Sequence, residues 1–118
     1  MTGYELMDRM GSLTSLLDAA LSAFGRRGND YAEAERKYRI GLAEKMLKLR
    51  ADGYPATLIP DLARGDREIA RLKFDRDAKE AVYKAAGEAI QSYKLQIRIT
   101  ENQIEREWGK NECSTMLS

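Results

Sequence analysis

Apolar residues recur every three or four positions along a first long stretch of the chain. They fall at Leu6, Met10, Leu13, Leu17, Ala20 and Phe24, then at Tyr31, Ala34, Tyr38, Leu42, Met46 and Leu49. This alternation indicates an amphipathic helix with a heptad seam. We therefore predict a first helical arm over residues 4–52.

A second stretch of the same kind runs from Asp66 to Trp108 without a proline. Arg76 and Lys79 are the charged members of its seam, which consists of Ile69, Leu72, Arg76, Lys79, Tyr83, Ala86, Ile90, Tyr93, Ile97, Thr100, Ile104 and Trp108. The pattern predicts a second arm over residues 66–108, followed by a polar tail over residues 109–118 that contains Cys113.

The connector between the arms, residues 53–65, contains both prolines of the chain, Pro55 and Pro60. Gly53 is suited to the left-handed conformation that closes a helix, and Pro55 disfavours helix at the residue before it. We expect a short helix capped by Thr57, with Pro60 in its first turn. Leu58, Ile59 and Leu62 would form its apolar underside.

Gly65 and Asp66 mark the change from this short helix to the second arm. Gly65 is suited to end the short helix, and Asp66 to cap the next one, where its carboxylate meets the positive end of the helix dipole. We interpret the connector as an interhelical turn whose apolar residues plug one end of a bundle.

Helix length favours an antiparallel hairpin. At 1.5 Å per residue the arms would be roughly 70 and 63 Å long, so they match. Folding at the connector would place residues whose numbers add up to about 118 opposite each other, such as Leu49 and Ile69. The predicted fold is an all-α, coiled-coil-like hairpin. The alternative is a three-helix bundle broken at Gly25–Asn29, where two glycines weaken the first arm.

A two-helix hairpin leaves some apolar residues outside its seam, and such faces call for a second packing partner. The candidate self-association residues are Met7, Leu16, Leu95 and Ile99. We predict self-association into a four-helix arrangement, with a dimer as the expected state. A monomeric mass in sedimentation at micromolar concentration would contradict this prediction.

Composition narrows the possible functions. The 118 residues contain no histidine and one cysteine, which removes the commonest general base and precludes an intrachain disulfide or a cysteine-based zinc site. Carboxylates two residues apart, such as Asp75 and Asp77, point to different sides of a helix, and Glu101 and Glu105, which share a side, fit a solvated surface with nearby arginines better than a catalytic pocket. We expect no catalytic site, metal or cofactor, no membrane span, and a cytoplasmic location.

Charge is balanced, with a net value of +1, so any charge-based contact must be local. One bias occurs near the connector, where six basic residues and an aromatic residue gather at the same end of the predicted hairpin. These candidate contacts for an acidic partner or nucleic acid are Lys45, Lys48, Arg50, Tyr54, Arg64, Arg67 and Arg71. Mixed charge on exposed helices is an ordinary alternative, because acidic residues lie among them.

Six short segments in the last two thirds of the chain carry a family resemblance: residues 48–59, 61–65, 70–72, 83–84, 88–90 and 103–108. On these segments the chain resembles small uncharacterised helical proteins of phages and prophages of Gram-positive bacteria. The resemblance implies an early genomic region, near single-strand annealing and single-strand-binding functions. It implies no residue roles.

We therefore expect a non-enzymatic helical adaptor that assists phage DNA recombination or replication by binding a protein partner and, more weakly, nucleic acid. Two alternatives remain open. One is an inhibitor of a host defence system, resembling anti-CRISPR proteins in size and lack of a catalytic site. The other is a purely structural coiled coil.

Overall fold

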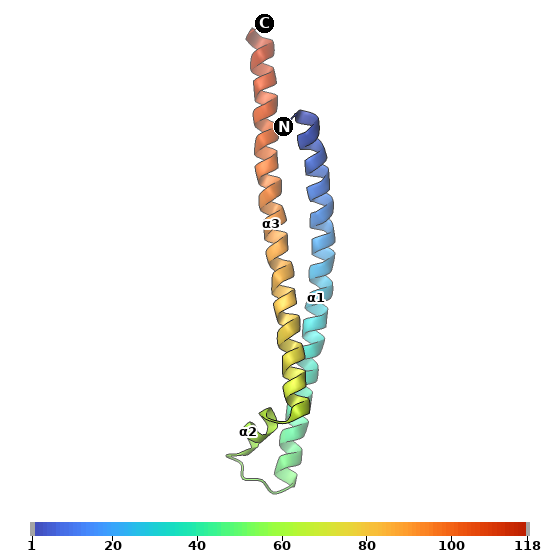
Figure 1. Ribbon diagram of the computed structural model, residues 1–118, viewed down its shortest axis with the longest axis vertical. Helices are drawn as coiled ribbons and strands as arrows, with labels where there is room; N and C mark the ends of the chain where they lie inside the picture. The colour runs from blue at the N-terminus through green and yellow to red at the C-terminus, as the bar shows by residue number, and fades with distance from the viewer. Residues whose placement is uncertain (1, 118) are drawn as a thin grey trace. The chain divides into compact units, whose positions relative to one another are not determined.

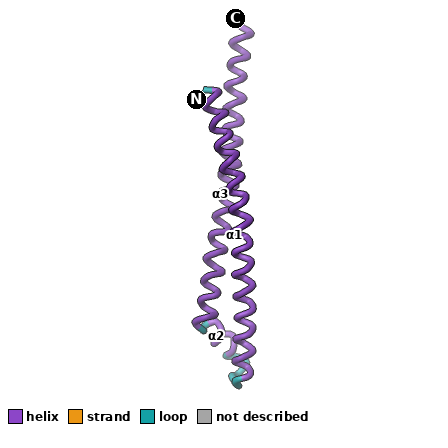
Figure 2. The backbone as a smooth tube through the Cα atoms, turned by 90° about the vertical axis from the view of Figure 1, so that its right-hand side faces the viewer, coloured by secondary structure: helices purple, strands orange, loops and turns teal. Residues whose placement is uncertain are grey.

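The computed structural model describes residues 2–117, which form three helices: α1 (Gly3–Ala51), α2 (Ile59–Arg64) and α3 (Arg67–Leu117). The two long helices pack antiparallel with the short helix between them in sequence (Figures 1 and 2). This confirms the predicted all-α hairpin. Helix α1 continues through residues 25–29, so the alternative of a broken three-helix bundle is wrong.

The chain divides into two compact units, each containing a segment of both long helices. The terminal unit consists of Met1–Phe24 and Ala86–Ser118, and the connector unit consists of Gly25–Ala85 and includes α2. Within the terminal unit, Leu6, Leu13 and Ile90 are buried, together with Thr100, whose hydroxyl donates to the Gln96 carbonyl at 2.8 Å.

Packing in the connector unit explains why glycine does not break α1. A Cβ atom on Gly28 would lie 3.0 Å from Cε1 of Tyr83, and one on Gly41 would lie 2.8 Å from Cδ1 of Leu72. Each glycine therefore makes room for a large side chain of α3. The contacts offset the roughly 1 kcal/mol that a helical glycine costs relative to alanine.

A comparison of two glycines in α1 tests this explanation. Gly25→Ala should raise the free energy of unfolding by about 0.5–1 kcal/mol, because nothing lies within 4 Å of its added Cβ atom. Gly28→Ala should gain less or lose stability, because its Cβ atom would press on the Tyr83 ring. Urea unfolding followed by circular dichroism measures both. Equal increases in the free energy of unfolding for the two variants would show that the Tyr83 ring moves aside without loss of stability.

The connector begins with a closed helix end. Gly53 has a φ of +87°, its N–H donates to the Arg50 carbonyl at 3.1 Å, and the Tyr54 N–H donates to the Leu49 carbonyl at 3.2 Å. These two bonds form a Schellman motif, which satisfies carbonyls that the last turn of α1 would otherwise leave unpaired.

Helix α2 differs in detail from the expected capping. Leu58 is its N-cap residue, with no side-chain cap hydrogen bond, so the expectation of a Thr57 cap is wrong. Pro60 lies in the first turn and Gly65 is the C-cap residue. Its buried residues are Ile59 and Ala63, whereas Leu58 and Leu62 are exposed. The buried side of α2 therefore differs from the predicted one. Ile59 and Ala63 are four residues apart and share one side of the helix, which leaves Leu58 and Leu62 on the exposed side.

The register of the hairpin also differs from the expected one. The two residue numbers add up to 111 in the Glu35–Arg76 and Lys45–Asp66 ion pairs and in the Gly28–Tyr83 contact, instead of about 118. In the terminal unit the Phe24–Gly87 contact has the same sum. The difference is one heptad, which leaves the apolar seam aligned and so cannot be detected from the seam alone.

The physical reason for the shift lies at the end of α1. Leu49 forms a buried cluster with Ile59 and Ala63 of α2, against which Leu42 and Met46 pack. Because α2 covers these residues of α1, α3 begins nearer to the N-terminus of α1, opposite Lys45. At the other end, α3 continues past the expected end at Trp108 to Leu117. Ser118 and the side chain of Cys113 lie outside the part of the chain that is described.

Candidate interaction site at the connector

The seven predicted contact residues all belong to the connector unit. Six of them are exposed, and the Lys45 side chain is 27% exposed. Three of the six cations are engaged within the chain: Lys45 with Asp66 at 3.3 Å, Arg64 with Asp61 at 3.6 Å, and Arg71 with Glu68 at 2.5 Å. These ion pairs reduce the positive charge that this end of the hairpin offers to a partner.

The remaining three cations are Lys48, Arg50 and Arg67. None of them has a carboxylate within 4.0 Å among the described residues. Lys48 and Arg50 lie in the last turn of α1, where positive charge is favourable to the helix dipole. These side chains are therefore the cations most available for an external anion.

Apolar side chains are exposed at the same end of the connector unit. Tyr54 is 48% exposed, Leu58 51% and Leu62 41%. Sequence reasoning placed both leucines on the covered side of α2 and so missed them as surface residues. We call the set of exposed apolar and available cationic residues the connector face: Lys48, Arg50, Tyr54, Leu58, Leu62 and Arg67.

Asp66 holds the start of α3 beside this face. Its Oδ2 atom accepts hydrogen bonds from the backbone N–H of Glu68 at 3.1 Å and of Ile69 at 3.2 Å. The pKa of Asp66 lies below its usual value, first because of the Ile69 N–H and then because of Lys45. The cap and the ion pair together fix where α3 begins relative to α1.

Stability should depend on pH through this group. Because folding lowers the pKa of Asp66, its contribution is fully present above the unfolded carboxyl pKa of about 4 and is lost as pH falls through the folded value. Asn also caps helices well but carries no charge. Asp66→Asn should therefore lower the thermal midpoint at pH 7, and this difference should shrink below about pH 4. A difference that is independent of pH would contradict the assigned role of the charge.

A charged layer crosses the hairpin seam within the same unit. Arg76 of α3 donates from Nη1 to Oε2 of Glu35 on α1 at 3.2 Å, and its guanidinium carbon lies 4.7 Å from the centre of the Tyr38 ring. The Arg76 and Glu35 side chains are only 21% and 23% exposed. The sequence marked Arg76 as a charged residue within the apolar seam of α3. The pattern along α3 alone does not show that Glu35 of α1 is its ion-pair partner.

The pKa values of this layer favour its charged forms. The pKa of Arg76 is raised, first by its hydrogen bond to Asp77 and also by Glu35. The pKa of Glu35 is lowered, first by Arg39 and also by Arg76. The layer therefore remains an ion pair throughout the neutral range.

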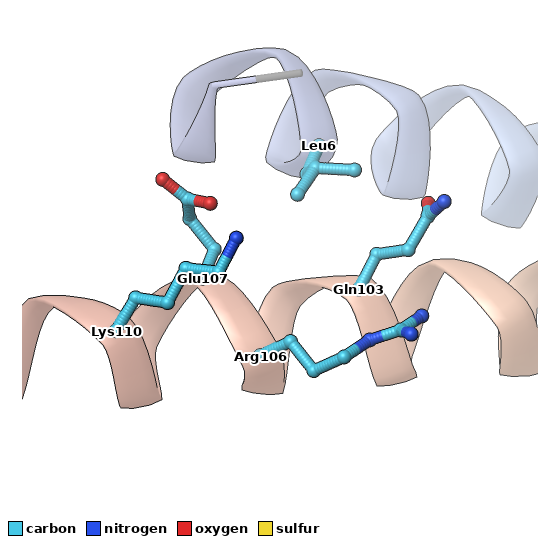
Figure 3. Close-up of a pocket in the computed structure, with 5 residues that line it drawn as sticks. All are labelled: Leu6, Gln103, Arg106, Glu107 and Lys110. Atoms are coloured by element: carbon cyan, nitrogen blue, oxygen red, sulfur yellow. The ribbon is translucent and has the colours of Figure 1, made fainter.

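Two grooves between α1 and α3 are candidate ligand sites. One, of about 380 Å³ in the connector unit, is lined by Ile69, Leu72, Gly41 and the charged residues Glu44, Lys45, Lys48, Asp66 and Glu68. The other, of about 340 Å³ in the terminal unit, lies where Leu6 of α1 points toward α3, and it is also lined by Gln103, Arg106, Glu107 and Lys110 of α3 (Figure 3). In the second groove Glu107 is the one carboxylate among the lining residues, so it offers no acidic pair for acid–base chemistry.

The described residues contain no group of three or more potential ligands that would hold a metal ion. Among the same residues, no helix is both long and apolar enough to cross a membrane. Neither observation assigns a function.

No protein-family model, curated protein or solved structure matches this chain. The class of the protein is therefore given by its fold, an antiparallel helical hairpin with a short helix in the connector.

Proposed function

We propose that this chain is a non-enzymatic adaptor that binds a protein partner through the connector face. The observation that supports the proposal is that α2 turns Ile59 and Ala63 inward while Leu58 and Leu62 stay exposed at the end that carries the available cations. Apolar anchors flanked by charge are typical of protein interfaces. The partner surface would be acidic at its rim and apolar at its centre.

The biological setting rests on the family resemblance alone. The resemblance supports a role in phage DNA recombination or replication in a bacterial host, and the expected location is the cytoplasm. Direct nucleic-acid binding is the weaker form of the proposal, because three of the six cations at this end already pair with carboxylates.

Self-association belongs to the same proposal, with a dimer as the expected state. The four predicted residues of the terminal unit are all exposed: Met7 54%, Leu16 47%, Leu95 55% and Ile99 48%. Among the described residues, more large apolar side chains are exposed than are buried in the core. A second copy would remove part of this surface from water, which favours association.

Neutralising the available cations tests the adaptor proposal. Lys48→Gln/Arg50→Gln/Arg67→Gln should weaken partner binding about tenfold, if each exposed cation contributes about 0.5 kcal/mol. The matched control is Lys37→Gln/Lys73→Gln/Lys94→Gln, which removes the same charge from exposed positions outside the connector face. Equal binding by both triple variants would contradict the proposed face.

The partner is obtained by affinity capture from phage-infected cells, with and without nuclease, and then purified for binding measurements. Recombination or single-strand-binding proteins support the proposed setting. Their loss after nuclease treatment would mean that nucleic acid bridges the contact. A host defence nuclease, captured irrespective of nuclease treatment, would replace the recombination role with inhibition of that enzyme.

A further inference from the structure

We propose that the hairpin of the connector unit has a second register, one heptad from the observed one, which the Glu35–Arg76 ion pair and the docked α2 helix together keep unoccupied. Capture of α2 by a partner would then remove one of these two constraints on the position of α3. The proposal concerns a conformational property of the fold and does not depend on the identity of the partner.

The second register follows from the seam. Moving α3 by seven residues toward the end of α1 would place Ile69 level with Leu49 and Leu72 level with Met46. The apolar residues of α1 that α2 now covers would therefore be covered by apolar residues of α3. A displacement of one heptad preserves the seam, so burial alone does not distinguish the two registers.

The same displacement is also compatible with the seam of the terminal unit. Phe24 would leave Gly87, which it now contacts, and would lie near Tyr93. Both positions belong to the seams of their helices, so an apolar side chain again meets an apolar side chain.

Charge favours the observed register. In the second register Arg76 would leave Glu35 and lie level with Leu42, and Lys79 would lie level with Arg39. The Lys45–Asp66 pair would also be lost, because Asp66 would lie level with Asp52. A cation at a seam position without its partner is unfavourable, and charged residues at such positions are known to specify register.

Shape favours the observed register as well. Tyr83 now lies over Gly28, and Leu72 lies over Gly41. Seven residues further along α1, the same side chains would meet Glu35 and Lys48, which offer no such space. The docked α2 helix adds a direct obstacle, because its Ile59 and Ala63 occupy the position that α3 would take.

Distances between spin labels would detect the slide. Ala32 of α1 and Ala70 of α3 are exposed, so both tolerate conversion to cysteine for labelling in a Cys113→Ser chain. In the observed register residue 70 lies level with about residue 41, and in the second with about residue 48. Seven residues correspond to about 10 Å along the helix, so the second register should give a distance about 10 Å longer.

Diluted with an excess of unlabelled chain, so that labels on two associated copies do not contribute, the labelled chain should show one distance. Arg76→Leu combined with Ile59→Asp, which removes the ion pair and undocks α2, should add the longer one. Arg71→Leu combined with Ile59→Asp is the matched control, because Arg71 pairs with Glu68 of its own helix. It should keep the single distance.

Glu35→Gln combined with Ile59→Asp breaks the same ion pair without adding an apolar side chain, and it should also add the longer distance. Circular dichroism shows which variants remain helical, and only those variants are compared. A single, unchanged distance in both ion-pair variants would overturn the proposal. The longer distance in the Arg71 control would also overturn it, since the ion pair would then not hold the register.

Discussion

Ile90→Ala is expected to lower the free energy of unfolding by about 2–5 kcal/mol. Ile90 is 5% exposed and lies in the seam of the terminal unit. Removing its side chain would leave a cavity, because two helices that are packed along their whole length cannot move together at one point. The variant would then lose both the transfer free energy of the removed atoms and their packing contacts. Urea unfolding followed by circular dichroism measures the effect.

Leu95→Ala on the same helix is the control. Leu95 is 55% exposed, so its truncation should change the stability of the monomer by less than about 0.5 kcal/mol. Measuring both variants at several protein concentrations separates the two roles, because loss of a self-association contact depends on concentration. A large, concentration-independent cost for Leu95→Ala would contradict its assignment to the surface.

Ile59→Ala is the second change with a large expected effect, and it should act locally on α2. Ile59 is 4% exposed and joins α2 to Leu49. Its truncation should cost about 2–5 kcal/mol of the free energy that holds α2 closed. The prediction can be checked by hydrogen exchange at the N–H groups of Leu62 and Gly65, which donate within α2 to Leu58 and Asp61.

Leu58→Ala, at the neighbouring position, is the matched control because Leu58 is 51% exposed. It should leave exchange at both amides nearly unchanged while weakening binding of a partner that uses the connector face. Equal acceleration of exchange by both variants would mean that α2 is not docked through the Ile59 side. The pair of variants therefore separates docking of α2 from recognition by it.

The position of α2 connects the stability of the fold to the proposed binding surface. Because Ile59 and Ala63 face α1, the two leucines beside them are turned outward. A partner that binds those leucines would contact an element that, in our proposal, helps to hold the hairpin register. Binding at the connector would in this way be coupled to the position of α3.

Periodicity by itself determined the two long helices, and their matched lengths on either side of the connector indicated that they pack antiparallel. Heptad spacing fixes which side of each helix is buried, and the buried residues Leu6, Leu13 and Ile90 all belong to the predicted seams. It also indicated the outward faces, because Leu95 and Ile99 lie off the seam and are exposed. These are local properties of each helix.

Only the tertiary structure decided the register, the face of α2 and the pairing of charges. A heptad seam repeats, so a shift of seven residues is invisible in sequence, and what selects one register is the contact of Arg76 with Glu35, of Tyr83 with Gly28, and of α2 with α1. A short helix has too few residues for its apolar side to be read from periodicity. Ion pairs such as Lys45–Asp66 join residues from different helices, and their formation depends on distances that only the folded chain defines.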